Sequence, residues 1–447
     1  MSASSWPEPA QPYVEDEVTT APQTERQPES QPASPRWSLA TRVAFRFAFV
    51  YLILYNFPVI FTLVEATQPI AEKIDGYWLV IVKPVALAVF GAKAELFPTG
   101  SGDTTFSYVL VFVMAAIAAM ATLIWSILDR RRANYAKLYV WLRVIVRYSL
   151  AVAMVSYGAA KVIKMQFPDP TLDRLVQPLG DMSPMGLLWT FMGFSKPYNI
   201  FTGAAEMLGG LLLTTRRTTL LGALVTAGVM ANVAMMNFAY DVPVKLYSTQ
   251  LLLMALFLTL PDLQRLANFF VFNRATEPTV LAPKTWRWLP IVRTLLVALF
   301  VITSLRDAHK YMLTRQSWTA ASPLQGIWSV DELSVDGVAH PPLTTDHARW
   351  RRLIVNGGQS MLIQNMDDTR KRHMIRDDVK EHMLWIFAGH EDKRPAKLTY
   401  ERRGADTVLL SGMFEGKKIA ATLHKEPHEF LLTTRGFHWI TELPFNR

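Results

Sequence analysis

The chain has 447 residues, 51% of them hydrophobic and 19% charged; this is too apolar for an average soluble protein and long enough for about two or three domains. It contains no cysteine, which excludes structural disulfides, thiolate zinc sites, iron–sulfur clusters and CxxC redox chemistry. All nine histidines lie after residue 305, which excludes a His-ligated haem in the apolar part. The net charge of +9 comes in short basic clusters between apolar runs, which is typical of membrane orientation signals and not of a nucleic-acid-binding face.

The N-terminal tail, residues 1–36, is rich in Pro, Glu, Gln, Ser and Thr and has almost no large aliphatic side chains. Such a segment buries too little apolar surface to offset the entropy of ordering, so we predict a disordered tail that ends near residue 40. It lacks a basic region followed directly by an apolar run, so we do not expect a cleaved signal peptide. The first apolar run, which begins at Val43, is interpreted as an uncleaved signal-anchor.

Apolar runs within residues 41–305 predict an α-helical multi-pass membrane bundle, because a hydrocarbon core about 30 Å thick needs roughly 20 apolar helical residues. The seven candidate spans are Val43–Val64, Phe106–Leu128, Trp141–Ile163, Tyr198–Thr214, Thr219–Phe238, Lys245–Leu260 and Trp288–Ser304. Two further apolar stretches, Trp78–Ala92 and Gly186–Phe194, are too short or too interrupted to span. We predict that these two form interfacial or re-entrant helices.

The distribution of Lys and Arg predicts how this bundle is oriented. Of the Lys and Arg residues in the tail and in the connections between the spans, most lie on one side of the seven spans: in the N-terminal tail, the loop with Arg130 and Arg131, the turn with Arg216 and the segment before Trp288. This pattern places the N-terminus in the cytoplasm and, after seven crossings, the C-terminal part outside. We therefore expect a bacterial inner-membrane protein whose C-terminal domain is periplasmic.

After a predicted linker at residues 306–317, residues 318–447 contain short alternating segments separated by Gly, Asp and Asn turns. A spacing of about 8–12 residues predicts an antiparallel meander of roughly nine strands, either closed as a small barrel or folded as a sandwich. The predicted strands are GIWSVDELSVDG, RWRRLIVNGG, SMLIQNMDD, KRHMIRDD, HMLWIFAG, AKLTYERRG, TVLLSGMFEG, KIAATLHKE and EFLLTTRGFHWITE. The predicted fold class is thus a helical membrane bundle followed by an all-β domain.

One acidic residue, Glu206, lies near the middle of a predicted span, where a charge is costly unless it is paired or hydrated. Lys161 lies near the outer end of the third span and Arg147 near its inner end. At 100° per residue the two fall within about 40° of one helix face, so we expect each to reach toward Glu206. Two interpretations stay open: a structural ion pair with snorkelling basic ends, or a ligand-binding or proton-handling role for Glu206.

Further polar side chains lie in the outward half of the predicted bundle. They include Tyr157, Asn232, Asn237, Tyr247 and Gln250, with Ser156, Tyr240, Asp241 and Lys245 nearby. In lipid such groups must find partners in protein or in a cavity, so we consider the first five, with Glu206, Lys161 and Arg147, as candidate ligand-binding residues of an outward-facing pocket. The alternative is hydrogen bonding between helices, supported by small residues such as Gly158 and Gly209 that allow close packing.

The remaining polar clusters have structural interpretations. The loop PTGSGDTTF offers Asp103 or Thr104 as the N-cap of the next helix, with an anion-binding turn as the alternative. In the C-terminal part His424 and His428 match no known zinc spacing. Thr422, His424 and Glu426 would share one face of a strand, but we predict no metal site there.

Two stretches, RYSLAVAMVSYGAAKVIK and AEMLGGLLLTTRRTTLLGALV, resemble the DoxX/DoxD-like membrane family. That family is marked by an Arg near the start of a helix, a Gly and a Lys near its end, and a later helix with Glu and Gly–Gly. These correspond here to Arg147, Gly158, Lys161, Glu206 and Gly209–Gly210. The resemblance covers about residues 143–270 and extends to 40–305. It implies a four-helix core and a link to redox homeostasis, since family members include the membrane subunit of a thiosulfate:quinone oxidoreductase.

The C-terminal part resembles a lipocalin-type barrel, a family that stacks an early Trp against a late Arg. The residues that carry this resemblance are Gly326-Ile327-Trp328 in the first predicted strand and Arg435 in the last. It implies a barrel that holds a ligand. A packed interior is the alternative, because nine strands and the closing segment RGFHWITELPFNR depart from a plain lipocalin.

Two functions follow from these expectations, with a ligand-free scaffold as a third. The first is the membrane component of a quinone-linked redox system, in which Glu206, Lys161 and neighbouring Tyr and Asn side chains bind the quinone headgroup and electrons arrive from a redox partner subunit. The second is a non-enzymatic binder or carrier of lipid-like molecules, in which the outer barrel exchanges ligand with the outward pocket. Whether the protein is an enzyme stays open at this point.

Overall fold

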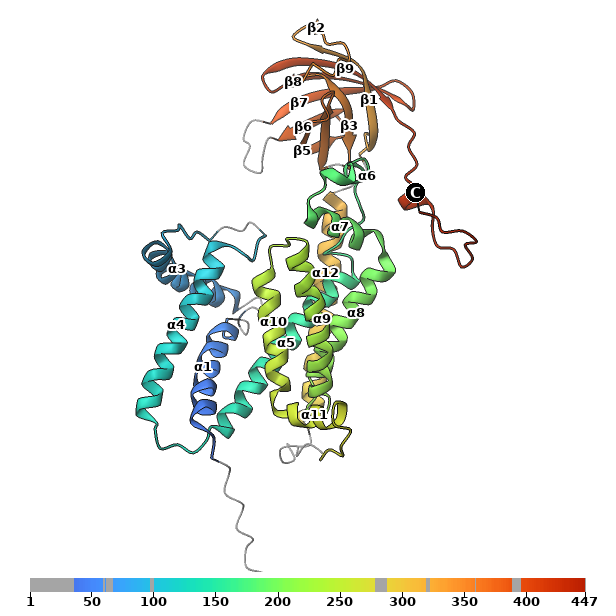
Figure 1. Ribbon diagram of the computed structural model, residues 1–447. Coiled ribbons are helices and arrows are strands. Elements are labelled where there is room, and N and C mark those ends of the chain that lie inside the picture. Colours follow the sequence, from blue (N-terminus) through green and yellow to red (C-terminus); the bar gives the residue numbers. More distant parts are fainter. Residues whose placement is uncertain are drawn as a thin grey trace, which may run out of the picture.

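The computed structural model describes residues 36–58, 61, 67–96, 100–277, 288–318, 322–357, 359–387 and 395–446. Apart from Arg36, the predicted disordered tail lies outside the described residues. At the end of the first predicted span, residues 59–60 and 62–64 also lie outside them. Helices form the first part of the described chain and strands the second part (Figure 1). The helical part and the β domain therefore follow one another as the sequence predicts.

The helical part is a bundle whose long helices run roughly alongside one another (Figure 1). Its helices are α1 (Leu39–Asn56), α3 (Gln68–Phe90), α4 (Thr105–Leu128), α5 (Ala136–Val162), α6 (Leu172–Leu175), η2 (Leu179–Asp181), α7 (Pro184–Phe194), α8 (Lys196–Leu213), α9 (Thr219–Ala239), α10 (Lys245–Thr259), η3 (Leu260–Asp262), α11 (Leu263–Phe270) and α12 (Leu289–Trp318). The described start of α1 and the β domain lie at opposite ends of this bundle.

Five helical segments of the described residues are long and apolar enough to cross a membrane: α1, α4, α5, α9 and the continuous stretch Lys245–Phe270. Only 22% of the apolar window of α4 is buried inside the protein. Apolar surface that is not covered by protein needs a lipid environment, because water solvates it poorly. This confirms the expected multi-pass membrane bundle.

The fourth and seventh predicted spans are also helices of this bundle, although they are not among the five segments. Helix α8 carries Lys196, Asn199 and Glu206, which lower its mean hydropathy. Helix α12 has 30 residues and continues through the segment that we predicted to be a linker, residues 306–317. The predicted linker residues 306–317 are therefore helical, and the structure next describes the chain from Ser322.

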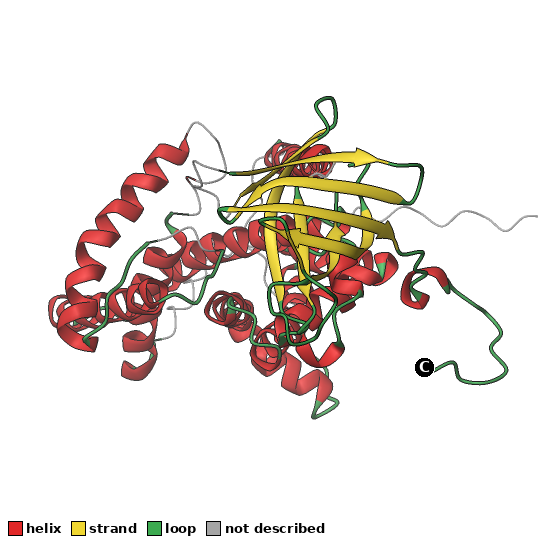
Figure 2. Cartoon of the chain, turned by 90° about the horizontal axis from the view of Figure 1, so that it is seen from above, coloured by secondary structure: helices red, strands yellow, loops and turns green. Residues whose placement is uncertain are grey.

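The two shorter apolar stretches form helices as well. Helix α3 begins before the predicted Trp78 and lies across the direction of the long helices (Figures 1 and 2). Helix α7 lies at the end of the bundle that faces the β domain (Figure 1). Its Leu188 and Met192 pack with Phe167 and Val242, so α7 covers the connection between α9 and α10.

The β domain is a closed antiparallel barrel, which decides between the two predicted architectures. Its strands are β1 (Gly326–Val335), β2 (Val338–Ala339), β3 (Trp350–Val355), β4 (Ser360–Asn365), β5 (Arg370–Asp378), β6 (Met383–Phe387), β7 (Ala396–Arg402), β8 (Thr407–Phe414) and β9 (Lys417–Lys425). Each strand from β3 onward pairs with the next, and β1 pairs with both β3 and β9, so eight strands close the barrel. The short strand β2 pairs antiparallel with the end of β1. Figure 2 shows the barrel from above.

Side chains fill the interior of this barrel. Along β9 the buried residues Ile419, Ala421 and Leu423 alternate with exposed neighbours, which is the pattern of a strand with one face inside. Trp328 is fully buried, and its indole N–H donates to the carbonyl of Leu324 (2.7 Å). The interior cluster also includes Trp350, Leu353, Val355, Met361, Ile363, Ile375, Leu384, Ile386, Leu398, Tyr400, Val408, Leu410 and Phe414. The packed interior is therefore the alternative that the structure favours.

The end of the chain differs from the prediction. The last predicted strand is instead the short helix α13 (Leu431–Thr434) followed by residues without regular structure. Strand β9 ends at Lys425, shortly before Pro427, which lacks the N–H that a central strand needs. Arg435 consequently lies over Phe445 (3.9 Å), and Lys425 is the cation over Trp328 (5.9 Å). The expected stacking of Trp328 on Arg435 was wrong.

The helical part contacts the barrel through α6, which lies in the connection between α5 and α7. The carboxylate of Asp173 pairs with Arg372, and its backbone N–H donates to Asn356 Oδ1 (3.1 Å). Leu172 and Val176 pack against an apolar group on the outside of the barrel, made of Ile327, Ile354 and Leu362. The barrel is thereby fixed to the end of the bundle by an ion pair and an apolar contact.

We expect acid to destabilise the barrel through Asp367. Thr369 and His347 hydrogen-bond its carboxylate and lower its pKa to about 2. An unfolded Asp titrates near pH 4, so this contribution to stability is present above about pH 4 and is lost as the pH falls toward 2. Asp367→Asn should weaken the acid dependence of thermal unfolding in this range, measured by Trp fluorescence of the full chain. Asp406→Asn, at an exposed turn, is the control; equal acid dependence in both variants would contradict the assignment.

Candidate functional site

Helices α5 and α8 approach so closely that side chains are excluded at their contact. A Cβ at Gly158 would lie 2.5 Å from Met207 Cγ and 2.6 Å from the carbonyl oxygen of Gly203. A Cβ at Gly210 would lie 2.9 Å from the carbonyl oxygen of Ala151. Glycines at these positions let the two helix backbones touch, as small residues do in membrane bundles. The same contacts show that the two helices run antiparallel.

Helix α9 packs on α8 in the same way. A Cβ at Gly209 would lie 2.6 Å from Thr226 Oγ1, and one at Gly222 would lie 2.7 Å from the backbone nitrogen of Leu213. Helix α8 is therefore held between α5 and α9 by glycine contacts on two of its faces. These contacts fix the position along α5 at which Glu206, the single acidic residue of α8, lies.

Glu206 forms a buried ion pair with Lys161, in the last turn of α5. The Nζ of Lys161 donates to Glu206 Oε1. The two residues are only 6% and 2% exposed, so both charges depend on each other for stabilisation. The second carboxylate oxygen, Oε2, accepts no hydrogen bond from the described residues. An oxygen that is buried and free can accept a hydrogen bond from a ligand.

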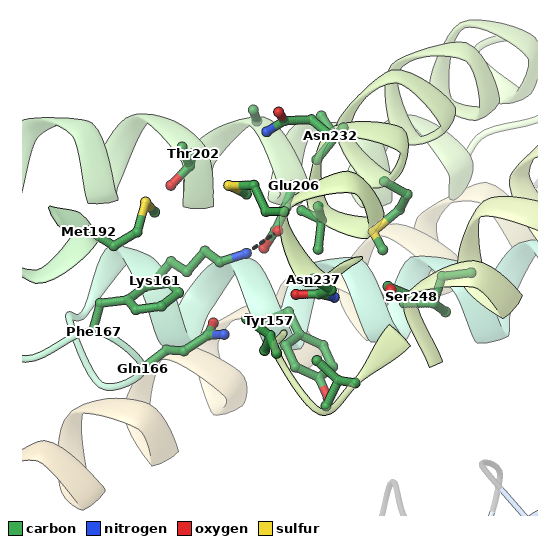
Figure 3. Close-up of a pocket in the computed structure, with 18 of the residues that line it drawn as sticks. Tyr157, Lys161, Gln166, Phe167, Met192, Thr202, Glu206, Asn232, Asn237 and Ser248 are labelled. Atoms are coloured by element: carbon green, nitrogen blue, oxygen red, sulfur yellow. Dashed lines mark hydrogen bonds and ion pairs between the residues drawn. The ribbon is translucent and has the colours of Figure 1, made fainter. Parts of the chain in front are cut away.

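The ion pair lines a cavity of about 360 Å³ (Figure 3). The cavity is also lined by residues of α7, which lies at the end of the bundle nearest the barrel (Figure 1). Helices α5, α7, α8, α9 and α10 and the connections between them surround it. The predicted residues that line it are Tyr157, Lys161, Glu206, Asn232, Asn237 and Tyr247. Its volume lies within the range of about 300–1,000 Å³ that is usual for small-molecule pockets. Six of the eight candidate residues therefore lie around one cavity in the structure.

The cavity combines an apolar wall with a small number of polar atoms. Asn237 is only 6% exposed, and its Nδ2 donor has no partner among the described residues. Gln166 Oε1 is likewise buried and unpaired. Figure 3 shows both amides in the region of the Lys161–Glu206 pair. Since buried polar groups are normally hydrogen-bonded, free donors and acceptors around one cavity are what a polar ligand group would satisfy.

Sequence reasoning missed the part of the wall that comes from α7 and the connection before it. These residues include Gln166, Phe167, Leu188, Trp189 and Met192. They lie outside the spans, where no helical periodicity indicates which side chains face the bundle. The only signal was the apolar stretch Gly186–Phe194, and its position over the cavity depends on tertiary packing.

Two predicted residues lie elsewhere. Arg147 is about 21 Å from Lys161 along α5 at 1.5 Å per residue, and the antiparallel register places it beyond Gly210, out of reach of Glu206. It donates instead to Thr219 Oγ1 (3.4 Å) and lies over the ring of Tyr148 (4.7 Å). The amide of Gln250 donates to the Tyr51 hydroxyl (2.7 Å) and does not line the cavity. The expectation that Arg147 reaches Glu206 was wrong.

The loop before α4 fixes the position of α10, which contributes Tyr247 to the cavity. Thr104 is the N-cap of α4, as predicted, because its Oγ1 accepts from the backbone N–H of Ser107 (3.2 Å). The Asp103 carboxylate accepts from the backbone N–H groups of Lys245 and Leu246 (2.9 Å each). Of the two candidates, Thr104 caps its own helix and Asp103 binds the start of α10.

The fold and the cavity together define a multi-pass membrane protein with a mainly apolar cavity that contains a buried ion pair in its bundle, and with a β-barrel at one end. No family model matches the chain, and no solved structure matches it. A stretch of 124 residues is 33% identical to the uncharacterized protein YwoB of Bacillus subtilis (strain 168) and covers 79% of that protein and 28% of this chain. The chain belongs to the family of YwoB.

We expect Gly158→Ala to destabilise the bundle, because its methyl group overlaps Met207 and the backbone of Gly203. Overpacking of this kind costs about 1–3 kcal/mol and should lower the melting temperature of the detergent-solubilised protein. Gly228→Ala is the control, since a Cβ at Gly228 meets nothing within 4 Å. A melting temperature of Gly158→Ala equal to that of Gly228→Ala would show that the α5–α8 contact is not tight.

We expect Lys161→Met to be more destabilising than the double variant Lys161→Met/Glu206→Gln. The single change leaves a buried carboxylate without its cation, which costs about 3–5 kcal/mol, whereas the double change removes both charges. Thermal or denaturant unfolding of the two variants, with Glu206→Gln alone, completes a double-mutant cycle. Additive effects would mean that the two side chains do not interact.

Proposed function

We propose that this protein binds a quinone-type molecule in the cavity beside Lys161 and Glu206 and is the membrane component of a quinone-linked redox system. The observation that carries the proposal is the buried ion pair on the wall of an otherwise apolar cavity. The resemblance of Arg147, Gly158, Lys161, Glu206 and Gly209–Gly210 to DoxX/DoxD-like proteins supports it as analogy. YwoB, being uncharacterized, neither adds to nor limits this choice.

The residues around the cavity fit a quinone. Its headgroup carbonyls accept hydrogen bonds, for which Lys161 Nζ and the unpaired Asn237 Nδ2 are the donors. In the reduced form its hydroxyls donate, for which Glu206 Oε2 and Gln166 Oε1 are the acceptors. Phe167, Trp189 and other apolar side chains suit the ring and the start of an isoprenoid tail.

A bound quinone would supply two-electron, two-proton redox chemistry. This chain's own part is to hold the headgroup, to exclude water from it and to keep a paired lysine and carboxylate beside its oxygens. The electrons would come from a redox partner subunit, as the resemblance implies. The carboxylate of Glu206 is the group placed to hold a proton next to the headgroup, because its Oε2 is not used in the ion pair.

The second candidate is a non-enzymatic binder of lipid-like molecules, and the same apolar cavity supports it. A ligand inside the barrel has less support, because Trp328, Trp350, Phe414 and their neighbours pack together there. A hollow of about 760 Å³ borders this cluster at Leu333, Tyr400 and Ala421. A carrier would therefore hold its ligand in the helical bundle. The identity of the molecule that co-purifies with the full chain discriminates between the two candidates.

We further propose that the protein lies in the bacterial inner membrane with its N-terminus in the cytoplasm and the barrel in the periplasm. The bias of Lys and Arg toward one side supports this orientation. The start of α1 and the barrel lie at opposite ends of the bundle, which agrees with it (Figure 1). The barrel would then stand over the outer end of the bundle, next to the cavity.

We expect protein purified in mild detergent to retain quinone, detected by solvent extraction and mass spectrometry. Glu206→Gln and Asn237→Leu should each lower the quinone-to-protein ratio several-fold, because the first removes the negative charge that holds Lys161 beside the headgroup and the second removes an amide donor. Gln250→Leu is the matched control, since it removes a buried amide outside the cavity. A ratio unchanged by both cavity variants would reject the quinone proposal, and lipid in place of quinone would favour the second candidate.

A further inference from the structure

A second groove lies on the lipid-facing side of the bundle, at the end opposite the barrel. It has a volume of about 480 Å³ and is formed by α5, the α8–α9 connection and α12. Its lining residues are Val144, Arg147, Tyr148, Ala151, Val152, Val155, Thr214, Arg216, Val292, Arg293, Leu296, Val297 and Phe300. It shares no lining residue with the cavity beside Glu206.

Three arginines line this groove: Arg147, Arg216 and Arg293. No acidic residue is part of the lining, and no carboxylate of the described residues lies within salt-bridge distance of any of the three. Three positive charges that converge without an internal counter-ion create a site that favours an anion. Phosphate oxygens suit it best, because guanidinium groups bind them with several parallel hydrogen bonds.

Arg147 is the buried member of this group. It is only 8% exposed, and its Nε has no hydrogen-bond partner among the described residues. A guanidinium held at membrane depth with an unused donor is costly unless a ligand or another group satisfies it. Its position in the groove, beside two more accessible arginines, therefore points to an anionic ligand.

The rest of the groove is apolar and open to the membrane. Leu296 of α12 is 60% exposed, and beyond Arg293 the lining of α12 up to Phe300 is apolar. On the facing wall of α5, beyond Arg147 and Tyr148, the lining residues are Ala151, Val152 and Val155. A narrow apolar channel that begins at a cluster of arginines has the polarity profile of a phospholipid: a phosphate at one end and acyl chains along the rest.

We propose that this groove is a binding site for an anionic phospholipid. The phosphate lies against Arg147, Arg216 and Arg293, and an acyl chain lies between α5 and α12. An anionic headgroup is preferred over a zwitterionic one, because a choline or ethanolamine group would bring a positive charge toward the same arginines. The bound lipid contacts both α12, which continues toward the barrel, and α5, which carries Lys161.

The test measures thermal stabilisation of the detergent-solubilised full chain by three probes: dioleoylphosphatidylglycerol, dioleoylphosphatidylcholine and inorganic phosphate. A ligand that binds the folded state stabilises it by an amount that grows with the logarithm of the ratio of its concentration to its Kd. We expect phosphatidylglycerol to give the same rise in melting temperature at a concentration about tenfold lower than phosphatidylcholine, and millimolar phosphate to give none. Arg216→Gln/Arg293→Gln should remove that tenfold preference, since each basic side chain contributes to binding an anionic headgroup.

The control is Arg130→Gln/Arg131→Gln, which removes the same charge from exposed positions in the α4–α5 loop. It should keep the preference for phosphatidylglycerol. Arg147 is left unchanged because it is buried, and Arg216→Gln alone serves as a second variant if the double variant folds poorly. Equal stabilisation by both lipids, a preference that survives Arg216→Gln/Arg293→Gln, or stabilisation by free phosphate alone would each overturn the proposal.

Discussion

The structure depends on the close approach of α5 and α8, which is possible because Gly158, Gly203 and Gly210 have no side chains. That contact brings the end of α5 against the middle of α8 and lets Lys161 reach Glu206. A wider separation would leave a carboxylate and an ammonium group buried apart, which is far more costly than burying them as a pair. Backbone packing and charge pairing thus require each other, and the cavity wall is built on both.

The same helices carry two sites of different character. Near the barrel, the cavity beside Glu206 has donors and acceptors that no described residue satisfies, which is suited to a small molecule with a polar head. At the other end, the arginine-lined groove is open to lipid and lacks acidic residues. Helix α5 lines both, with Lys161 at one end and Arg147 at the other. A ligand in either site therefore contacts the helix that the glycine contacts hold in place.

The barrel differs inside from what its closed strand order suggests. Its closed strand order is that of a ligand-binding barrel, but large side chains such as Trp328 and Trp350 occupy the interior. Its contact with α6 uses the ion pair of Asp173 with Arg372 and the apolar residues outside the sheet. The barrel thus contacts the same connection that supplies Gln166 and Phe167 to the cavity wall.

The sequence by itself determined the elements whose signals are local. Continuous apolar runs indicated the spanning helices, and period-two alternation indicated eight strands of the barrel, because both patterns reflect burial within one element. Glu206 could be singled out because an acidic residue among apolar ones is costly in lipid, and this cost can be inferred without coordinates.

Only the tertiary structure decided which cation pairs with Glu206. Arg147 and Lys161 share a helix face, and it is the register between α5 and α8 that leaves Arg147 near Thr219. The cover by α7, the position of Arg435 and the filled barrel likewise depend on contacts between residues far apart in the chain, and no local pattern encodes such contacts.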